Sequence, residues 1–343
     1  MGVIAKTSLA FSLATISAGI AYYFLKQDKK EKIPKKWQEV GIVKKLCIYP
    51  LKSGNRIELS KAECTEVGLK QSEQDEPVYQ LKDRGLIVYG EKDCEFRTGR
   101  TYPKMVLIDV GVHDVDHLSI DAHTMRTLYV KVPKKDENKE TKITVHRGEQ
   151  IVGVDCGDEA ASWFSRYILE KPSGLRLAYH DGGERRNITK THKPLLDYYL
   201  NLGNESTGLY SDLSSIMIVN QQSINDLNKR IGSGTHASVD NFRSNIVVDG
   251  PKLAPYAEDD WDWVKIGDVV LRNVKECTRC IFTTVNPDTA QRSSDREPLK
   301  TLETYRLSEG PYKTPVMGIN AGVRRTGLIH VGDTVYFAKN EVQ

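Results

Sequence analysis

The stretch Lys275-Glu276-Cys277-Thr278-Arg279-Cys280-Ile281-Phe282-Thr283-Thr284-Val285-Asn286-Pro287-Asp288-Thr289 places two thiols on either side of a guanidinium. A strand-like run from Asp268 to Val274 precedes it, and the Asn-Pro-Asp sequence predicts a turn. We therefore expect a β-hairpin with the cysteines at its mouth and the β-branched residues after Cys280 in its second strand. An adjacent cation favours the thiolate, which is the form that binds soft metals or attacks electrophiles.

A Cys-x-x-Cys pair by itself is open to several interpretations. A structural zinc site needs four ligands, usually from two such pairs, and the other four cysteines are single and scattered. A thioredoxin-like pair needs a strand-to-helix context, whereas β-branched residues and a turn follow here. The remaining interpretation is two half-buried cysteines that pack as small hydrophobes.

Composition excludes some classes of protein. The 343 residues provide enough chain for one large or two modest domains. A net charge of +3 is too small for a dedicated nucleic-acid binder. Six cysteines without paired spacing indicate a reducing compartment.

The N-terminus predicts a membrane anchor. Ser8 to Leu25 is an uncharged apolar run, close to the roughly 20 residues that cross a bilayer. Six lysines follow it before Trp37, which by the positive-inside rule leaves the folded body in the cytosol. A cleaved signal peptide is less consistent, because the charge lies on the wrong side of the run. We assign residues 1–39 to a single transmembrane helix and a basic tether.

The rest of the chain predicts an α+β, β-rich fold in two modules, residues 40–180 and 181–343. Strands are expected at 43–49, 175–179, 216–219 and 246–248, and helices at 158–169 and after a Ser223 cap. The first helix presents Trp163, Phe164, Tyr167 and Ile168 on one face, which indicates core packing. No histidines have ligand spacing, and His180 and His192 are expected to be solvated loop residues.

Several polar residues next to predicted strands are suited to an anion. Lys52 and Ser53 form a turn after the first strand, and Asp212 and Ser214 lead into a buried one. Arg243 precedes another apolar strand, where a buried guanidinium must find an anion or carbonyls. For Lys52 with Ser53 and for Asp212 with Ser214, the alternative is an ordinary polar turn without a ligand.

The Cys-Thr-Arg-Cys motif, the following Thr-Thr-Val-Asn-Pro-Asp-Thr, and later Arg296-Glu-Pro-Leu299 and Thr304-Tyr-Arg306 resemble the MOSC domain. More narrowly, the chain from about Val40 onward is similar to the mitochondrial amidoxime-reducing components, membrane-anchored molybdenum enzymes. The resemblance implies a barrel-like MOSC domain preceded by a MOSC N-terminal β-rich module. It places the molybdenum ligand at Cys280, with no assigned role for Cys277.

The resemblance also supplies candidate contacts for the anionic molybdenum cofactor (Mo-molybdopterin), and Asp212 and Ser214 join them from the residues alone. Four cations from distant segments would repel one another unless such a ligand lay between them; they are Lys52, Arg84, Arg243 and Arg279. Asn320 lies in a segment that differs from the family's more aromatic pattern, and Thr278 stands where serine often occurs. The candidates are Lys52, Ser53, Arg84, Asp212, Ser214, Arg243, Asn245, Thr278, Arg279 and Asn320.

By resemblance, the activity is reduction of N-hydroxylated compounds (amidoximes, hydroxylamines and N-hydroxyguanidines), with oxygen leaving as water. Electrons come from NADH through NADH-cytochrome b5 reductase and cytochrome b5, and Asp212 is a candidate proton donor. The sequence contains no Gly-x-Gly-x-x-Gly unit, so we do not expect the chain to bind a nicotinamide cofactor directly. The implied location is the mitochondrial outer membrane facing the cytosol; an endoplasmic-reticulum anchor would have the same sequence features.

Two other classes of function stay open. MOSC domains also occur in cofactor sulfurases, so Cys280 could carry a persulfide in a sulfur-carrier or cofactor-delivery protein. No pyridoxal-phosphate domain precedes the motif, which weakens that hypothesis. A membrane-tethered module that binds an anion without turnover is the third.

Overall fold

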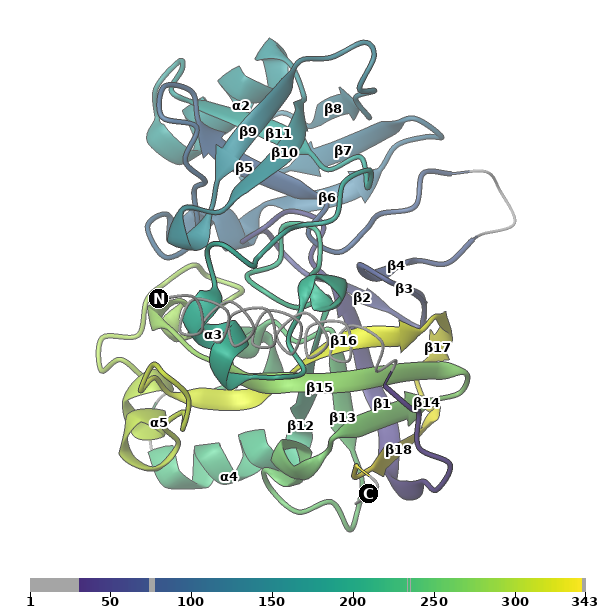
Figure 1. The fold of residues 1–343 in the computed structure, drawn as a ribbon. Helices are drawn as coiled ribbons and strands as arrows, with labels where there is room; N and C mark the ends of the chain where they lie inside the picture. Colours follow the sequence, from purple (N-terminus) through teal and green to yellow (C-terminus); the bar gives the residue numbers. More distant parts are fainter. Residues whose placement is uncertain (1–30, 74–77, 233, 235, 341–343) are drawn as a thin grey trace, which may run out of the picture. The chain divides into compact units, whose positions relative to one another are not determined.

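A β-barrel is closed by the first strand, β1 (Gln38–Ile48). The computed structural model describes residues 31–73, 78–232, 234 and 236–340. The other barrel-sheet strands are β2 (Ile57–Leu59), β12 (Ile216–Asn220), β13 (Ile246–Asp249), β14 (Trp263–Ile266), β15 (Val269–Thr278), β16 (Val316–Arg325) and β18 (Thr334–Ala338). They follow the order β13-β12-β16-β15-β14-β18-β1-β2, and a β1–β13 pairing joins the sheet into a ring (Figure 1).

Three smaller sheets accompany the barrel. The four-stranded sheet, in the order β5-β11-β10-β9, contains β5 (Leu86–Gly90), β9 (Glu140–Thr144), β10 (Gln150–Asp155) and β11 (Leu175–Tyr179). The two three-stranded sheets contain β6 (Asp109–Val112), β7 (His117–Asp121) and β8 (Leu128–Lys131), and β17 (Gly327–His330), β3 (Lys61–Thr65) and β4 (Gly68–Gln71). The expected α+β, β-rich fold is confirmed.

Helices are few and short in the described residues. They are α2 (Asp158–Leu169), α3 (Lys193–Tyr198), α4 (Gln221–Ile231) and α5 (Leu299–Tyr305). The 3₁₀ helices are η1 (Pro103–Leu107), η2 (His146–Gly148), η3 (Asn204–Ser206), η4 (Val239–Phe242), η5 (Ala257–Asp260) and η6 (Ile281–Thr284). Helix α2 buries Trp163, Phe164 and Ile168 as predicted.

The predicted cap of the second helix was wrong by one turn. Helix α4 begins after Asn220, whose side-chain oxygen accepts a hydrogen bond from the Gln222 N–H at 2.8 Å. Ser223 is buried inside the helix and donates instead to the Glu258 carboxylate at 2.8 Å. An asparagine directly after a strand was the stronger capping signal.

The predicted hairpin around the cysteines was also wrong in its second half. Strand β15 continues to Thr278 and pairs with β16, whereas Ile281–Thr284 forms η6. The hydroxyls of Thr283 and Thr284 donate to carbonyls three residues earlier, at 3.0 and 2.7 Å. Such local bonds give threonine an alternative to a strand ladder. The turn at Asn286 is present, because its side chain accepts from the N–H groups of Asp288 and Thr289.

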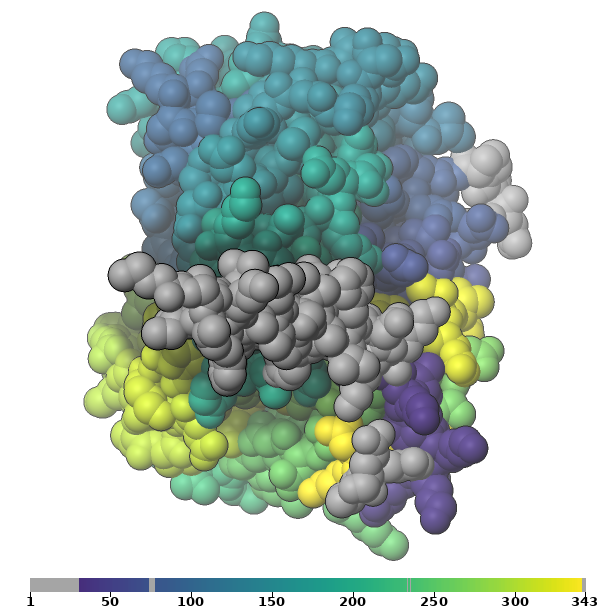
Figure 2. Space-filling view, in the orientation of Figure 1, coloured from purple at the N-terminus to yellow at the C-terminus, as the bar shows by residue number. Residues whose placement is uncertain are grey.

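The described residues from Lys36 onward form one compact unit. One hydrophobic cluster joins barrel residues such as Leu46 and Ile319 to Phe164 on α2 and Leu177 on β11. The surface view shows purple residues from the start of the described chain beside yellow residues from its end, as the β1–β18 pairing requires (Figure 2). The division into modules at residue 180 stays a prediction.

The predicted membrane anchor, Ser8 to Leu25, lies outside the described residues. Within the described part of the chain, no helix combines the length and apolar character needed to span a bilayer.

Candidate functional site

One cavity of about 540 Å³ brings the predicted site residues together. Its walls come from the barrel strands and from the loops around η2, η4 and η6. Every candidate from the sequence lines it: Lys52, Ser53, Arg84, Asp212, Ser214, Arg243, Asn245, Thr278, Arg279, Cys280 and Asn320. That these residues bind a cofactor stays a prediction.

The cavity wall is strongly cationic. Among its described lining residues, the basic side chains are Lys52, Arg84, Arg100, Arg147, Arg243, Lys275 and Arg279, and the one carboxylate is Asp212. Like charges in a partly enclosed space repel one another unless an anion is present. The wall therefore favours a ligand with several negative charges.

Three predicted residues have strained backbones at this wall. Ser53, Arg84 and Arg243 have φ angles of 69°, 47° and 53°. Left-handed conformations at residues other than glycine cost energy and concentrate at functional sites. Here they direct side chains from three separate turns towards one space.

Arg243 is half-buried and lacks a full set of partners in the described residues. Its guanidinium stacks on Tyr49 at 4.1 Å and lies 5.4 Å from the Phe282 ring, while Nη1 donates to the Gly54 carbonyl at 2.8 Å. Nη2 has no hydrogen-bond partner in the described residues. Burial, together with Arg84, lowers the pKa of Arg243 to about 10. A buried, unpaired donor of this kind is costly and indicates a missing acceptor.

Arg84 is not the surface ion pair that a lone Asp-Arg sequence suggests. Its Nη1 lies 2.5 Å from Asp83, a buried carboxylate that also accepts from the Tyr49 N–H at 2.8 Å. Nη2 donates to the carbonyl of Arg243 at 3.0 Å. Asn245 accepts from Arg84 at 3.3 Å and donates to the Cys47 carbonyl at 3.2 Å. These contacts hold the two arginines in fixed positions.

Lys52 and Asp212 form an ion pair at 2.5 Å. Lys52 also donates to the carbonyl of Tyr210 at 2.8 Å, and His146 Nε2 lies 3.3 Å from Asp212. Crowding by protein atoms opposes ionisation of Asp212, but Lys52 and His146 outweigh it and hold its pKa well below the usual range. An ionised carboxylate has no proton to deliver, so the environment argues against Asp212 as the proton donor.

Cys280 is exposed to the cavity, and the neighbouring cation favours its thiolate too weakly to outweigh the partial loss of water. The Arg279 guanidinium points to backbone, donating from Nε and Nη2 to the Met317 carbonyl at 3.0 and 2.7 Å and from Nη1 to Phe242 at 3.0 Å. Partial loss of water raises the pKa of Cys280 despite Arg279 and Arg100. The free side chain is therefore mainly a thiol, and binding to a metal would deprotonate it.

Ser214 and Asn320 meet on one wall. The Ser214 hydroxyl lies 2.8 Å from Asn320 Oδ1 and 2.9 Å from the Ile216 carbonyl. Ser211, the residue before Asp212, has a buried hydroxyl without a partner in the described residues. It lines the same cavity, so it is a second polar atom that lacks a partner there.

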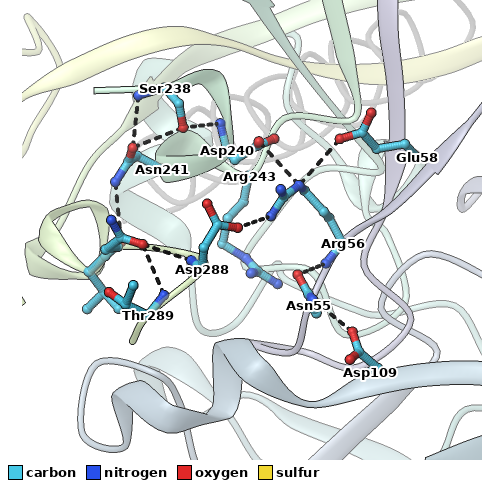
Figure 3. A network of polar contacts seen from close by, with 12 residues as sticks. Asn55, Arg56, Glu58, Asp109, Ser238, Asp240, Asn241, Arg243, Asp288 and Thr289 are labelled. Atoms are coloured by element: carbon cyan, nitrogen blue, oxygen red, sulfur yellow. Dashed lines mark hydrogen bonds and ion pairs between the residues drawn. The ribbon is translucent and has the colours of Figure 1, made fainter. Parts of the chain in front are cut away.

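A polar network fixes the loop of Arg243 against the segment after Cys280 (Figure 3). Arg56 lies between Asp240 and Asp288, at 3.2 and 3.1 Å. Asn241 donates to the carbonyls of Thr283 and Val285 at 3.0 and 3.2 Å. The predicted metal ligand and the predicted anion-binding arginine are thus held in one framework.

Sequence reasoning missed much of the cavity wall. Arg100, His146, Arg147, Tyr199, Ser211, Lys275 and Tyr312 all line it. His192 also lines it and is buried, and His180 is buried too, so the expectation of solvated loop histidines was wrong. Burial lowers the pKa of His180 to about 4. The one available signal was the position of Lys275, two residues before Cys277 of the cysteine motif.

Comparisons with known proteins show the family to which the chain belongs. The MOSC domain pattern matches residues 205–336, and the MOSC N-terminal beta barrel domain pattern matches residues 40–171. Mitochondrial amidoxime-reducing component 1 of Homo sapiens is 36% identical over 308 residues, covering 87% of this chain and 83% of that protein. Its counterparts in Mus musculus and Danio rerio are 34% and 32% identical, each covering 95% of this chain and 90% and 91% of theirs. This chain belongs to the mitochondrial amidoxime-reducing component family.

The cavity of this family member fits an anionic metal cofactor. The unpartnered Arg243 Nη2 and Ser211 hydroxyl supply donors without acceptors in the part of the chain that is described. Cys280 supplies the soft sulfur ligand that molybdenum accepts, and it is exposed in the same cavity. The residues present therefore fit such a cofactor at both the metal end and the anionic end.

Proposed function

We propose that the chain is a molybdenum-cofactor-dependent reductase of N-hydroxylated compounds. The relatives are named as mitochondrial amidoxime-reducing components. The observation that carries the proposal is the cavity shared by an exposed Cys280 and by Arg243, whose Nη2 is buried without a partner in the described residues. In one cavity, the Cys280 thiol would match the metal end of an anionic metallopterin, and Arg243 would match its phosphate end.

The residues of this chain would take distinct parts. When bound, the molybdenum cofactor supplies two-electron oxygen-removal chemistry. Cys280 would hold the metal as a thiolate, while Arg84, Arg243 and Lys52 would neutralise the negative charge of the pterin and its phosphate. Ser53, Ser214, Asn245, Thr278 and Asn320 offer polar contacts, and Arg279 braces the wall through backbone carbonyls.

Asp212 acts in this proposal as the counter-ion of Lys52. The ion pair at 2.5 Å holds the ammonium at the cavity wall, and His146 approaches Asp212 from the other side. The proton source for water formation is a separate group or solvent.

The proposed electron supply is NADH through cytochrome b5 reductase and cytochrome b5. The proposed location follows the relatives' names and the apolar N-terminal run: the mitochondrial outer membrane, with the catalytic body in the cytosol. Anchoring the electron carriers in one membrane would raise their effective concentration at the enzyme.

Metal analysis tests the proposal. We expect about one molybdenum per chain, and Cys280→Ser to lose it because a hydroxyl is a poor soft-metal ligand. Cys277→Ser, which changes the other thiol of the same motif, is the matched control and should keep the metal. A metal-free protein that remains active would refute the proposal.

Turnover separates the proposal from its rivals. Loaded protein should reduce benzamidoxime with reconstituted electron donors. A loaded protein that does not turn over would favour cofactor delivery, and a persulfide found on Cys280 by mass spectrometry would favour sulfur transfer.

A further inference from the structure

Lys275 is a buried ammonium that the proposed cofactor contacts do not use. It lies on β15 opposite Asn320 of β16, lines the cavity and is only 6 % exposed. Its Nζ donates to the Glu276 carbonyl at 2.6 Å. In the described residues no carboxylate lies within 4.0 Å of it, whereas Lys52, the other buried lysine, has Asp212 at 2.5 Å.

An aromatic ring and a backbone carbonyl hold this ammonium in place. Its Nζ lies 5.0 Å from the centre of the Tyr199 ring. The Tyr199 hydroxyl donates to the Glu276 carboxylate, which also accepts from Ser308. Burial, with Arg279 and Arg147, lowers the pKa of Lys275, although Cys277 and Glu276 act in the opposite direction. Glu276 accepts from two hydroxyls and makes no direct ion pair with Lys275, so the ammonium has no carboxylate at contact distance among the described residues.

A second cation marks the same side of the cavity. Arg147 is exposed, stacks on the Tyr312 ring at 4.4 Å and donates to the Tyr312 hydroxyl at 2.8 Å. Ser308 and Tyr312 belong to one loop, and both line the cavity. We call Lys275, Tyr199, Ser308, Tyr312 and Arg147 the Lys275 corner. It combines two cations lacking carboxylate partners in the described residues with two flat aromatic walls.

We propose that the Lys275 corner binds the carboxylate or phosphate of a small planar substrate, with Lys275 as its main anchor and Arg147 at the rim. This inference rests on the proposed function for the identity of the reacting group. Leu195 and Pro311 also line the cavity and suit an apolar or aromatic body. The anchor would select acidic N-hydroxylated compounds over neutral ones, because a desolvated charge pair is worth more than a solvated one.

A pair of substrates that differ in one charge tests the inference on the full-length, molybdenum-loaded enzyme. We expect para-carboxybenzamidoxime to show a KM about tenfold below that for benzamidoxime, and Lys275→Met to abolish that preference. Lys313→Met removes an exposed cation from the loop of Ser308 and Tyr312, and this variant should keep the substrate preference. Methionine fills the space of the lysine stem. Lys275→Gln is a second variant without the charge; it should also lose the preference while its melting temperature stays unchanged, which excludes a folding defect.

The alternative source of the anion is the cofactor phosphate. Lys275→Met protein should keep its molybdenum and pterin content; loss of either would assign Lys275 to the cofactor and overturn the inference. An unchanged substrate preference in Lys275→Met would overturn it as well.

Calorimetric binding separates failure of this inference from failure of the proposed function. If neither substrate is turned over, the proposed function fails. The binding of para-carboxybenzamidoxime then still shows whether the Lys275 corner binds an anionic group. Binding that is about tenfold weaker in Lys275→Met than in the parent and Lys313→Met supports the corner. Equal binding in all three refutes it.

Discussion

Arg243 and Arg279 both line the cavity, but their contacts indicate different roles: ligand binding for Arg243 and structural support for Arg279. Arg279 donates from three nitrogens to the carbonyls of Met317 and Phe242. Arg243 makes one such bond, to Gly54, and leaves Nη2 without a partner in the described residues. Removing a satisfied donor leaves carbonyls unpaired, whereas removing an unsatisfied buried charge relieves a cost.

Substituting each arginine by methionine should therefore give opposite results. Arg243→Met is expected to lower molybdenum content at least tenfold while changing the unfolding free energy of cofactor-free protein by less than about 1 kcal/mol. Arg279→Met is expected to lose about 2 kcal/mol of stability. Metal analysis and chemical denaturation measure the two effects. A large stability loss in Arg243→Met, with metal retained, would make Arg243 structural.

Glu258 predicts a pH dependence of stability far from the cavity. It is fully buried in η5 and accepts a hydrogen bond from Ser223 at 2.8 Å. Burial, with Asp259, raises its pKa from 4.5 to about 7. The folded protein thus keeps a proton that the unfolded chain releases. The stability from Glu258 is fully present below about pH 4.5 and is lost as the pH rises to about 7.

The comparison with Glu258→Gln isolates this effect. Glutamine mimics the protonated acid, so parent stability should fall relative to the variant by on the order of 3 kcal/mol between about pH 4.5 and about pH 7. Chemical denaturation at several pH values measures the difference. A difference that does not change with pH would mean that Glu258 titrates normally.

Element η6 packs closely against a distant segment of the chain. A Cβ on Gly99 would lie 2.2 Å from the Phe282 ring, closer than any real contact. Phe282 is the second residue of η6, and its ring also lies 5.4 Å from the Arg243 guanidinium. The glycine makes room for the ring, and the ring helps to direct the segment that begins at Cys280.

Gly99→Ala should therefore change the cavity more than the stability. The ring is the end of a side chain and can move, so we expect less than about 1.5 kcal/mol of destabilisation but about tenfold lower molybdenum content. Gly85→Ala is the control, because its Cβ would have ordinary contacts at 3.5 Å. Unfolding free energy and metal analysis are the measurements; full metal content in Gly99→Ala would show that the position of Phe282 is unimportant.

The same element shows why sequence patterns predicted only part of the fold. Helix α2 and strand β11 have the predicted ends because their apolar periodicity and their start and stop residues are local. The β-branched run after Cys280 looks equally local, but its threonines bond backwards and its phenylalanine packs on Gly99. Those contacts outweigh strand propensity, which depends strongly on context.

Site prediction had the same limit. Arg84, Arg243 and Cys280 could be placed by resemblance, and they do share one cavity. Lys275 and Arg147 could not, because their function depends on what lies opposite them. Only the folded chain shows that Lys275 lacks a carboxylate among the described residues while Lys52 has one.

At the scale of the whole molecule, β1 links the parts that the sequence separated into modules. It pairs with β13, β18 and β2, and its buried residues join the cluster that includes Phe164 and Leu177. The Lys52 turn follows directly after it. A barrel closed by a strand from the other end of the chain should unfold together with the sheets that share its core.

Leu46→Ala and Ile42→Ala test this coupling within one strand. Leu46 is fully buried, so its truncation should cost about 3 kcal/mol, whereas Ile42 is 47 % exposed and should cost less than about 1 kcal/mol. We expect one calorimetric transition, shifted downward in Leu46→Ala, with hydrogen exchange in α2 accelerated to the same extent as in β13. Two transitions, of which only the barrel's moves, would instead show that the barrel unfolds independently of the sheet that packs against α2.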